Sequence, residues 1–389
     1  MLTQRLKTLI VDDSLVFRKI LCDLLKKFEE IEIVGQAPNG KIALAKVIDL
    51  KPDLVFLDLD MPEMSGIQVI DELKKQQIQC GIIIVSGASS SMCKVAVRAL
   101  NSGAFDFISK PVCDTIHETM KILEVDLGSK LKAFFLRYNC SGPAFFLKQE
   151  KPTHEEIMVS QPTEITKTEK SIRLFTPDLI IIGISTGGPP ALTKIFGEIH
   201  QPLKTPVIIV QHIPVNFSEA LAASIQERSG LVTHQAEEGM LLEESHIYIA
   251  PGGHHLALTR NKIRNEYVFA LSNDPPVNNC RPSIDYLIES AHKNFNGQIA
   301  LFIMTGMGTD GLNGARLLKS AEKHLIIAQS EDSCVVYGMP KAIVEAGLAN
   351  EILHLNEIPN RLERLGNRKN QSHAGDSLNK TDITEFERG

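Results

Sequence analysis

The sequence predicts an α/β protein made of two doubly wound parallel-sheet domains, the second carrying an antiparallel hairpin annex. Short apolar runs alternate with amphipathic stretches over residues 5–125, and a second such rhythm begins at residue 178. A polar stretch separates the two. This alternation is typical of open parallel sheets with helices on both faces. The length of 389 residues is enough for two domains of ordinary size.

The composition is that of an ordinary globular protein, with 43% hydrophobic and 23% charged residues. The net charge of −6 disfavours nucleic acid as a partner. No apolar run approaches the ~20 residues of a membrane helix, and the N-terminus lacks the pattern of a secretory signal. Seven scattered cysteines without a C-x-x-C pair suit a reducing compartment. We therefore expect a cytoplasmic protein without direct membrane insertion.

In the first domain, over residues 5–125, five apolar runs are predicted to be strands. They are Leu6–Val11, Glu32–Gly35, Leu54–Leu57, Ile82–Ser86 and Phe105–Ile108. Amphipathic segments near 15–28, 39–49, 65–76, 92–102 and 112–125 are predicted to be the helices between them. In sheets of this kind ligands bind at the carboxyl ends of the strands.

Polar side chains follow four of these strands. Asp12 and Asp13 end the first strand, Asp58 the third, Ser86 the fourth and Lys110 the fifth. Carboxylates that converge at one sheet edge repel each other and need a cation, for which Mg²⁺ is suited. A single aspartate here often caps the next helix, and a single Lys–Pro is usually a turn. The whole set instead predicts a site that holds an acyl phosphate.

These residues resemble the receiver domain of two-component response regulators, which has a flavodoxin-like fold. The matching strings are LIVDDS, FLDLDMPEMSG, IIIVSGAS and DFISKP. The resemblance implies that a partner histidine kinase phosphorylates Asp58. It implies that Mg²⁺ is held by Asp13, Asp58 and the backbone carbonyl of Asp60, with Asp12 helping through water.

The same resemblance implies three switch positions, Ser86, Phe107 and Lys110, whose rearrangement reports phosphorylation. For Phe107, plain packing in the core is an equally good interpretation.

Residues 126–176 are predicted to be a linker, because QEKPTHEEIMVSQPTEITKTEK is rich in Thr, Glu, Lys and Gln. Its first part, AFFLRYNCSGPAFF, is unusually aromatic for a linker. A docking segment and a short helix explain that part equally well. Residues 366–389 are polar and are predicted to be a disordered tail.

The second domain is expected over residues 177–365. The runs LIIIGI and PVIIVQ predict buried strands. HIYIAP, HHLALTR and EYVFALS follow with short turns and predict an antiparallel hairpin or meander. IALFIMTG and LIIAQS return to the parallel pattern.

Three strand ends of this domain carry the residue types of a serine hydrolase. GISTGG fits G-x-S-x-G and exposes Ser185 at a helix start, the next strand delivers His212, and a glycine-rich loop after a later strand delivers Asp310. The expected roles are nucleophile, general base and orienting carboxylate. The backbone N–H of Met307, or those that follow Ser185, are candidates for the oxyanion hole.

Each of these features has a simpler interpretation. GISTGG alone is equally typical of an anion-binding helix start, although it lacks the lysine of a phosphate-binding loop. Asp310 could cap the helix that follows it. The α/β-hydrolase fold is disfavoured, because its order is Ser, Asp or Glu, then His, whereas here His212 precedes Asp310.

Over about residues 178–365 the chain resembles the chemotaxis protein-glutamate methylesterases, the CheB family. The matching strings are IGISTGGPPAL, VIIVQHIPVNF, IYIAPGGHHL, CRPSIDYL, FIMTGMGTDG and CVVYGMPKAI. The resemblance implies a triad of Ser185, His212 and Asp310 that needs no cofactor. It implies hydrolysis of glutamyl γ-methyl esters, and deamidation of specific glutamines, on methyl-accepting chemoreceptors. A receiver-linked signalling scaffold with a non-catalytic second domain is the alternative.

Overall fold

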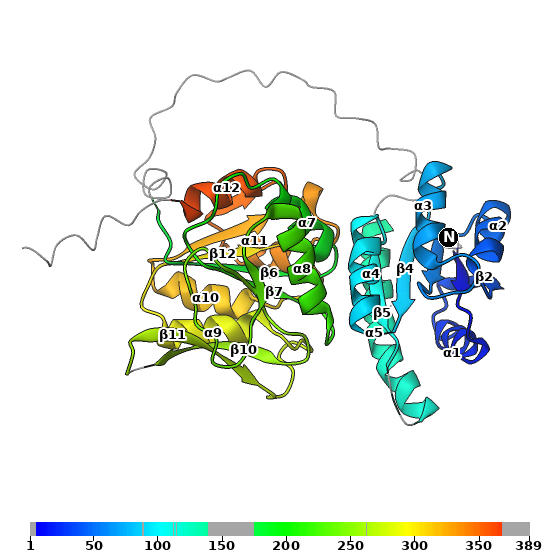
Figure 1. Cartoon of the computed structure of the whole chain (residues 1–389), viewed down its shortest axis with the longest axis horizontal. Coiled ribbons are helices and arrows are strands. Elements are labelled where there is room, and N and C mark those ends of the chain that lie inside the picture. Colours follow the sequence, from blue (N-terminus) through cyan, green and yellow to red (C-terminus); the bar gives the residue numbers. More distant parts are fainter. Residues whose placement is uncertain are drawn as a thin grey trace, which may run out of the picture.

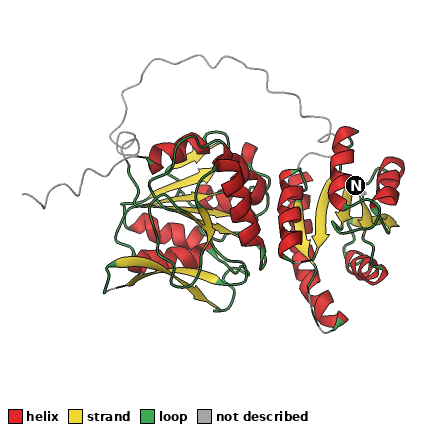
Figure 2. Cartoon of the chain, viewed as in Figure 1, coloured by secondary structure: helices red, strands yellow, loops and turns green. Residues whose placement is uncertain are grey.

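The computed structural model describes residues 5–138 and 175–367, apart from positions 88, 112, 114 and 262. These residues form two α/β units, each built on a parallel sheet with helices on both faces (Figures 1 and 2). A separate two-stranded antiparallel hairpin lies in the second unit. The expected fold class is confirmed.

The first sheet has the strand order β2-β1-β3-β4-β5, all parallel. Its strands are β1 (Leu6–Val11), β2 (Ile31–Ala37), β3 (Leu54–Leu57), β4 (Gly81–Ser86) and β5 (Asp106–Ser109). The helices are α1 (Leu15–Leu25), α2 (Gly40–Leu50), α3 (Gly66–Lys75), α4 (Ser90–Asn101) and α5 (Ile116–Tyr138). The strands β3 and β4 are buried along their whole length, as expected for a sheet covered on both faces.

Polar caps start several of these helices. The Ser14 hydroxyl accepts a hydrogen bond from the Phe17 N–H, and the Asn39 side chain accepts one from the Ile42 N–H. Such caps satisfy backbone donors that have no partner inside the helix. The first capped helix therefore begins directly after the acidic pair at the end of β1, which keeps that pair at the sheet edge.

The helix α5 is longer than the sequence analysis expected, because residues 126–138, assigned there to the linker, continue it. Leu123, Leu127, Leu131 and Phe134 are buried along one side of the helix, at the spacing of three and four residues that a helix face needs. Part of the aromatic stretch is thus core. Residues 139–174 and the tail from 368 onward lie outside the described residues.

The second sheet has the order β14-β13-β12-β6-β7-β9-β8, also parallel. Its strands are β6 (Leu179–Ile184), β7 (Val207–Gln211), β8 (Thr233–Gln235), β9 (Ile247–Ile249), β12 (Ile299–Ile303), β13 (Leu325–Gln329) and β14 (Glu351–Leu353). The hairpin is β10 (His255–Asn261) and β11 (Glu266–Ser272). The α-helices are α7 (Gly188–Gly197), α8 (Phe217–Ser229), α9 (Ile284–Asn294), α10 (Leu312–Ser320), α11 (Met339–Glu345) and α12 (Ile358–Gly366), with a 3₁₀ turn η2 (Glu331–Ser333).

One expectation for this domain was wrong in detail. The run HIYIAP does not join an antiparallel meander, because β9 pairs in parallel with β7 and β8 inside the main sheet. Among the strands of the described residues, β10 and β11 are the pair that runs antiparallel. The two edge strands β8 and β14, of three residues each, were not anticipated.

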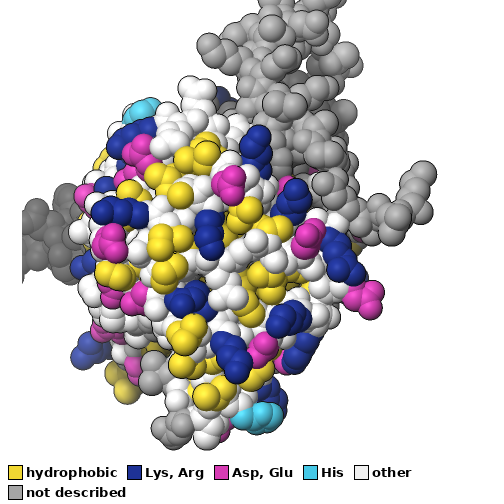
Figure 3. Space-filling model, turned by 90° about the vertical axis from the view of Figure 1, so that its right-hand side faces the viewer, with side chains coloured by type: hydrophobic (Ala, Val, Ile, Leu, Met, Phe, Trp, Pro, Cys, Tyr) yellow, Lys and Arg dark blue, Asp and Glu magenta, His cyan; other side chains and the backbone are white. Residues whose placement is uncertain are grey.

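The two units contact each other through α4 and β5 of the first and α7 and α8 of the second (Figure 1). Over the described ranges, no helix combines the length and the apolar character that crossing a bilayer would require. The face of the first unit shown in Figure 3 mixes basic and acidic side chains without a patch of one sign.

Candidate functional sites

The structure brings the acidic residues of the first domain together. Asp12 and Asp58 are buried and Asp13 is exposed, and their ligand-type oxygens lie within 4.8 Å of one another. Backbone N–H groups orient the carboxylates, with Ser14 donating to Asp12 Oδ1 at 2.8 Å and Asp60 donating to Asp58 Oδ1 at 3.2 Å. A close set of oxygen ligands of this kind fits a hard cation such as Mg²⁺.

Lys110 lies in the same cluster. Its Nζ is 2.7 Å from Asp12 Oδ2 and 2.5 Å from Asp58 Oδ2. Burial raises the pKa of Asp58, and the hydrogen bond and charge of Lys110 offset only part of this rise. Ser86 is fully buried, and its hydroxyl has no hydrogen-bond partner among the described residues. The cluster therefore holds an acid, a counter-charge and an unused donor at one strand edge.

Phe107 makes a contact that the sequence did not anticipate. Its ring stacks on Phe217 of the second domain, with centroids 3.9 Å apart and planes 23° from parallel. Phe217 begins α8, directly after the loop that follows His212. The predicted switch residue of the first domain thus touches the segment that leads away from the general-base candidate of the second.

The second site lies at β6, the strand from which the sheet is extended first on one side, by β7, and later in the chain on the other side, by β12. The central strand β6 is flanked by β7 and β12. Ser185 and His212 directly follow the paired residues Ile184 and Gln211, so they are neighbours at the sheet edge. Asp310 lies on the loop after β12. Ligand sites in open α/β sheets form at such reversal points.

Asp310 is 2% exposed and accepts hydrogen bonds on both carboxylate oxygens. The donors to Oδ2 are His212 Nε2 at 2.8 Å and the Ile284 N–H at 2.7 Å. The donors to Oδ1 are the Ser283 hydroxyl at 2.8 Å, Asn278 Nδ2 at 2.9 Å and the Asp285 N–H at 3.2 Å. The carboxylate therefore lies at the N-terminus of α9, where the helix dipole favours a negative charge.

Asp310 does not cap the helix that follows it in sequence. The cap residue of α10 is Gly311, without a side-chain hydrogen bond. Burial alone would raise the pKa of Asp310, but the bond and charge of His212 and the other donors lower it to about 2. The residue is thus built to stay ionised beside an imidazole.

His212 is oriented by Asp310 through Nε2, which leaves Nδ1 as the nitrogen available for proton transfer. That nitrogen is 3.5 Å from the Cys280 sulfur. Burial by itself lowers the pKa of His212, but the hydrogen bonds and charges of Asp310 and Cys280 outweigh burial and raise it to about 9. Among the described residues, no hydrogen bond joins the Ser185 hydroxyl to His212. The serine and the imidazole follow neighbouring strands, and proton transfer requires the two side chains to come within hydrogen-bond reach.

The glycine-rich loop lies against Ser185. A Cβ built on Gly306 would be 2.6 Å from Ser185 Cβ, so only glycine permits this approach. The loop is fixed by bonds from the Gly306 N–H to Val336 O at 3.0 Å and from the Met339 N–H to Gly306 O at 2.9 Å. Within the described part of the chain, the Met307 N–H donates no hydrogen bond. It is therefore free to act as the oxyanion donor beside Ser185.

Several residues around this site were missed by the sequence analysis, and most lie between β11 and α9. Val277 and Cys280 form a two-residue turn, with hydrogen bonds of 2.8 and 3.1 Å between their backbones. Asn278 and Asn279 occupy the left-handed region at its centre, with φ of 53° and 61°. The Asn-Asn pair was the one local signal for this turn.

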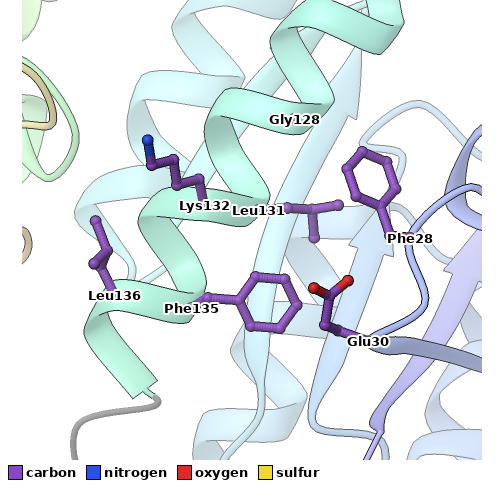
Figure 4. A pocket seen from close by; sticks show the side chains of 7 residues that line it. All are labelled: Phe28, Glu30, Gly128, Leu131, Lys132, Phe135 and Leu136. Atoms are coloured by element: carbon purple, nitrogen blue, oxygen red, sulfur yellow. The ribbon is translucent and has the colours of Figure 1, made fainter.

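One pocket of the first domain does not take part in either site. It lies between α5 and the segment before β2, lined by Phe28, Glu30, Gly128, Leu131, Lys132, Phe135 and Leu136 (Figure 4). Glu30 precedes the amino end of β2, so the pocket is at the opposite edge of the sheet from Asp58.

Comparison with known families matches both halves of the chain. The model of the response regulator receiver domain matches residues 8–121, and the model of the CheB methylesterase matches residues 180–362. A protein-glutamate methylesterase/protein-glutamine glutaminase from Desulfotalea psychrophila is 39% identical over 91% of this chain and 97% of its own length. The protein of the same name from Bacillus subtilis is 36% identical over 91% of this chain and 96% of its own length.

Among solved structures, the CheB methylesterase catalytic domain of Thermotoga maritima is 35% identical, with a TM-score of 0.46, over 48% of this chain and 97% of that one. Identity of this extent along almost the whole length of the curated relatives decides the family. The chain belongs to the protein-glutamate methylesterase/protein-glutamine glutaminase family, with a receiver domain followed by a CheB methylesterase domain.

Proposed function

We propose that Ser185, His212 and Asp310 form the catalytic triad of a phosphorylation-activated methylesterase and glutaminase, and that Asp58 is the phosphoryl acceptor. The observation that carries the proposal is the hydrogen bond between His212 and Asp310, whose carboxylate accepts bonds from four further donors. Ser185 lies at the end of the strand next to the one that carries His212. The names of the relatives indicate methyl esters of protein glutamates and protein glutamines as substrates. We propose that these are glutamyl γ-methyl esters and specific glutamines of methyl-accepting chemoreceptors.

In the proposed reaction, Ser185 Oγ attacks the ester carbonyl while its proton moves to His212 Nδ1. Asp310 stabilises the imidazolium through Nε2. The carbonyl oxygen becomes negative next to the Met307 N–H. Collapse releases methanol, or ammonia from glutamine, with the proton from Nδ1. Water then repeats the sequence on the acyl-enzyme and frees the glutamate.

The interface supports regulation by the receiver domain. Besides the stack of Phe107 on Phe217, Asn101 Nδ2 donates to Ser224 Oγ at 3.3 Å, and Arg137 Nη1 donates to Cys334 O at 3.0 Å. Met307, Val335 and Val336 pack with the hydrophobic core of the receiver domain that includes α5. The oxyanion candidate thus lies at the domain boundary. Phosphorylation of Asp58 would weaken this contact and shift the population toward an open site.

Asp12, Asp13 and Asp58 would hold the Mg²⁺ that phosphorylation requires, which would supply charge neutralisation for the phosphoryl group. The phosphodonor would be a chemotaxis-type histidine kinase. We assign the chain to the cytoplasm, because this is where it would meet the histidine kinase and the receptor helices.

The decisive experiment measures methanol release from methylated receptor by the full chain. Ser185→Ala should lower the rate by on the order of 10³-fold or more, because triad members act as a unit. Ser320→Ala, an exposed serine on α10, is the matched control and should leave the rate unchanged. Wild-type protein without methanol release would instead favour a non-catalytic second domain.

A further inference from the structure

The pair formed by Cys280 and His212 has the geometry of half a metal site. A zinc ion bound to sulfur at about 2.3 Å and to imidazole nitrogen at ~2.05 Å, at a near-tetrahedral angle, separates the two ligand atoms by roughly 3.5 Å. The distance between Cys280 Sγ and His212 Nδ1 is 3.5 Å. The two atoms therefore already lie at the separation that a shared tetrahedral ion requires.

The other nitrogen of the imidazole is held as metal sites hold it. Metal-binding histidines usually donate their second N–H to a carboxylate, which fixes the ring and strengthens the ligand. Asp310 takes this role at His212 Nε2, 2.8 Å away. Atoms of His212, Cys280 and Asp310 lie within 4.8 Å of one another. Ligand, partner ligand and orienting carboxylate are thus assembled in one place.

Cys280 is fixed in position rather than carried on a free loop. The Val277–Cys280 turn closes with two backbone hydrogen bonds. The central Asn278 donates through Nδ2 to Asp310 Oδ1 at 2.9 Å and to Asp285 Oδ2 at 2.9 Å. The turn and the carboxylate that orients His212 are therefore one hydrogen-bonded unit, and an ion would bind without reorganising it.

The charges contributed by the receiver domain do not oppose a cation here. Lys130 of α5 is the receiver-domain cation that interacts with Cys280 across the domain boundary. Its ammonium, however, is 3.1 Å from Asp106 Oδ1 and also interacts with Asp126. The cation of Lys130 is therefore offset by two carboxylates.

We propose that Cys280 and His212 Nδ1 form an inhibitory site for a thiophilic divalent cation, such as Zn²⁺ or Cd²⁺. The thiol, and the imidazole where Nδ1 is protonated, each release a proton to solvent when the ion binds, and water fills the remaining positions. The ion occupies the nitrogen lone pair that must accept the proton of Ser185, so hydrolysis stops until the ion leaves. The inhibition rests on the proposed function, whereas the binding does not.

Binding is tested first, with Cd²⁺ and the full chain. Cadmium bound to a thiolate gives an ultraviolet charge-transfer band that ions at the oxygen ligands of the receiver site do not give. We expect this band in wild type and in Cys113→Ala, a half-buried cysteine of the receiver domain. We expect its loss in Cys280→Ala. A band of equal strength in Cys280→Ala would overturn the site.

A second measurement needs no substitution. Iodoacetamide labelling of Cys280 in the wild-type chain, followed by peptide mass analysis, should slow at least tenfold in Zn²⁺, with labelling of Cys113 unchanged. Equal labelling of Cys280 with and without Zn²⁺ would contradict the proposal.

Inhibition is tested on methanol release at constant Mg²⁺, with each variant compared to its own rate without Zn²⁺. The Zn²⁺ concentration for half-inhibition should rise at least ~100-fold in Cys280→Ala, since the loss of even an outer partner costs ~10–100-fold in metal affinity. Unchanged inhibition in Cys280→Ala would place the zinc effect elsewhere and refute the site. If the chain releases no methanol at all, the cadmium band and the labelling still decide whether the ion binds.

Discussion

Asp58 and Asp310 occupy equivalent places in the two domains and are held in opposite ways. Both are nearly buried, at 3% and 2% exposed, and both lie at the carboxyl edge of a parallel sheet. Burial raises the pKa of Asp58 despite Lys110, whereas Asp310, for which burial acts in the same direction, has a pKa lowered to about 2 by its donors.

The difference lies in how many fixed donors each carboxylate has. Asp58 is held by one backbone N–H and by the flexible side chain of Lys110. An oxygen held only by a lysine can be released to attack a phosphoryl group. Asp310 has five donors, four of them from the segment 278–285. Such a carboxylate cannot act as a nucleophile, but it can orient and stabilise an imidazolium.

The largest effect expected from this comparison is that of Asp310→Asn. Replacement of one carboxylate oxygen by an amide NH₂ group favours the wrong tautomer of His212. The substitution should therefore lower methanol release ~10³–10⁴-fold. Asp332→Asn, an exposed acid on η2, should leave the rate unchanged. Near-normal turnover by a folded Asp310→Asn protein, judged by circular dichroism, would show that the triad is misassigned.

The pH dependence of hydrolysis comes next in size. The pKa of His212 is raised to about 9, so below that pH the imidazole is protonated and cannot accept the proton of Ser185. The kcat/KM should therefore rise with pH, by on the order of tenfold per unit, up to about pH 9. Cys280→Ala removes the side chain whose interaction with Nδ1 raises the pKa of His212, and should move the limb to lower pH. If the pH dependence of kcat/KM is the same in Cys280→Ala as in the wild type, Cys280 does not influence the pKa of His212.

Asp58→Asn should abolish activation without affecting the triad. Because an amide cannot accept the phosphoryl group, the ratio of rates with and without a small-molecule phosphodonor should fall to one. The rate without phosphodonor should match that of the unphosphorylated wild type. Incorporation of radioactive phosphate checks the acceptor directly, and label retained on Asp58→Asn would identify another acceptor.

The smallest effect expected is that of the interdomain stack. Aromatic pairs contribute ~0.5–1.5 kcal/mol, so Phe107→Ala should raise the unphosphorylated rate by roughly two- to tenfold if the contact keeps the site closed. Phe28→Ala, at the pocket on the far edge of the receiver sheet (Figure 4), is the matched control. A Phe107→Ala rate equal to that of this control would separate the stack from regulation.

The residues predicted from the sequence are those that directly follow a strand. An apolar run that ends in a polar residue is a local pattern, and it revealed Asp12, Asp58, Ser185 and His212. Asp310 was found through the glycine-rich loop that carries it. The parallel sheets follow from the same alternation of strands and helices.

What the sequence did not reveal depends on contacts between distant segments. The contact between Cys280 and His212 arises because a turn brings together two residues that are 68 positions apart in the sequence. The contact of Phe107 with Phe217 joins two domains. The way two domains pack against each other produces no hydrophobic periodicity in the sequence of either one. The extension of α5 was missed because its polar side obscured the buried row that includes Leu127 and Leu131.

The reversal of strand order at β6 also determines when the site can exist. Ser185 and His212 become neighbours once β6 pairs with β7, but the carboxylate that orients His212 arrives only when β12 pairs with the other side of β6. Distant pairings of this kind form slowly, because chain entropy opposes them. Under the proposed triad, a ribosome-bound chain from which residues 299–310 have not yet emerged has Ser185 without the carboxylate that orients its base. The proposed esterase activity would then begin only after most of the second domain has been synthesised and folded.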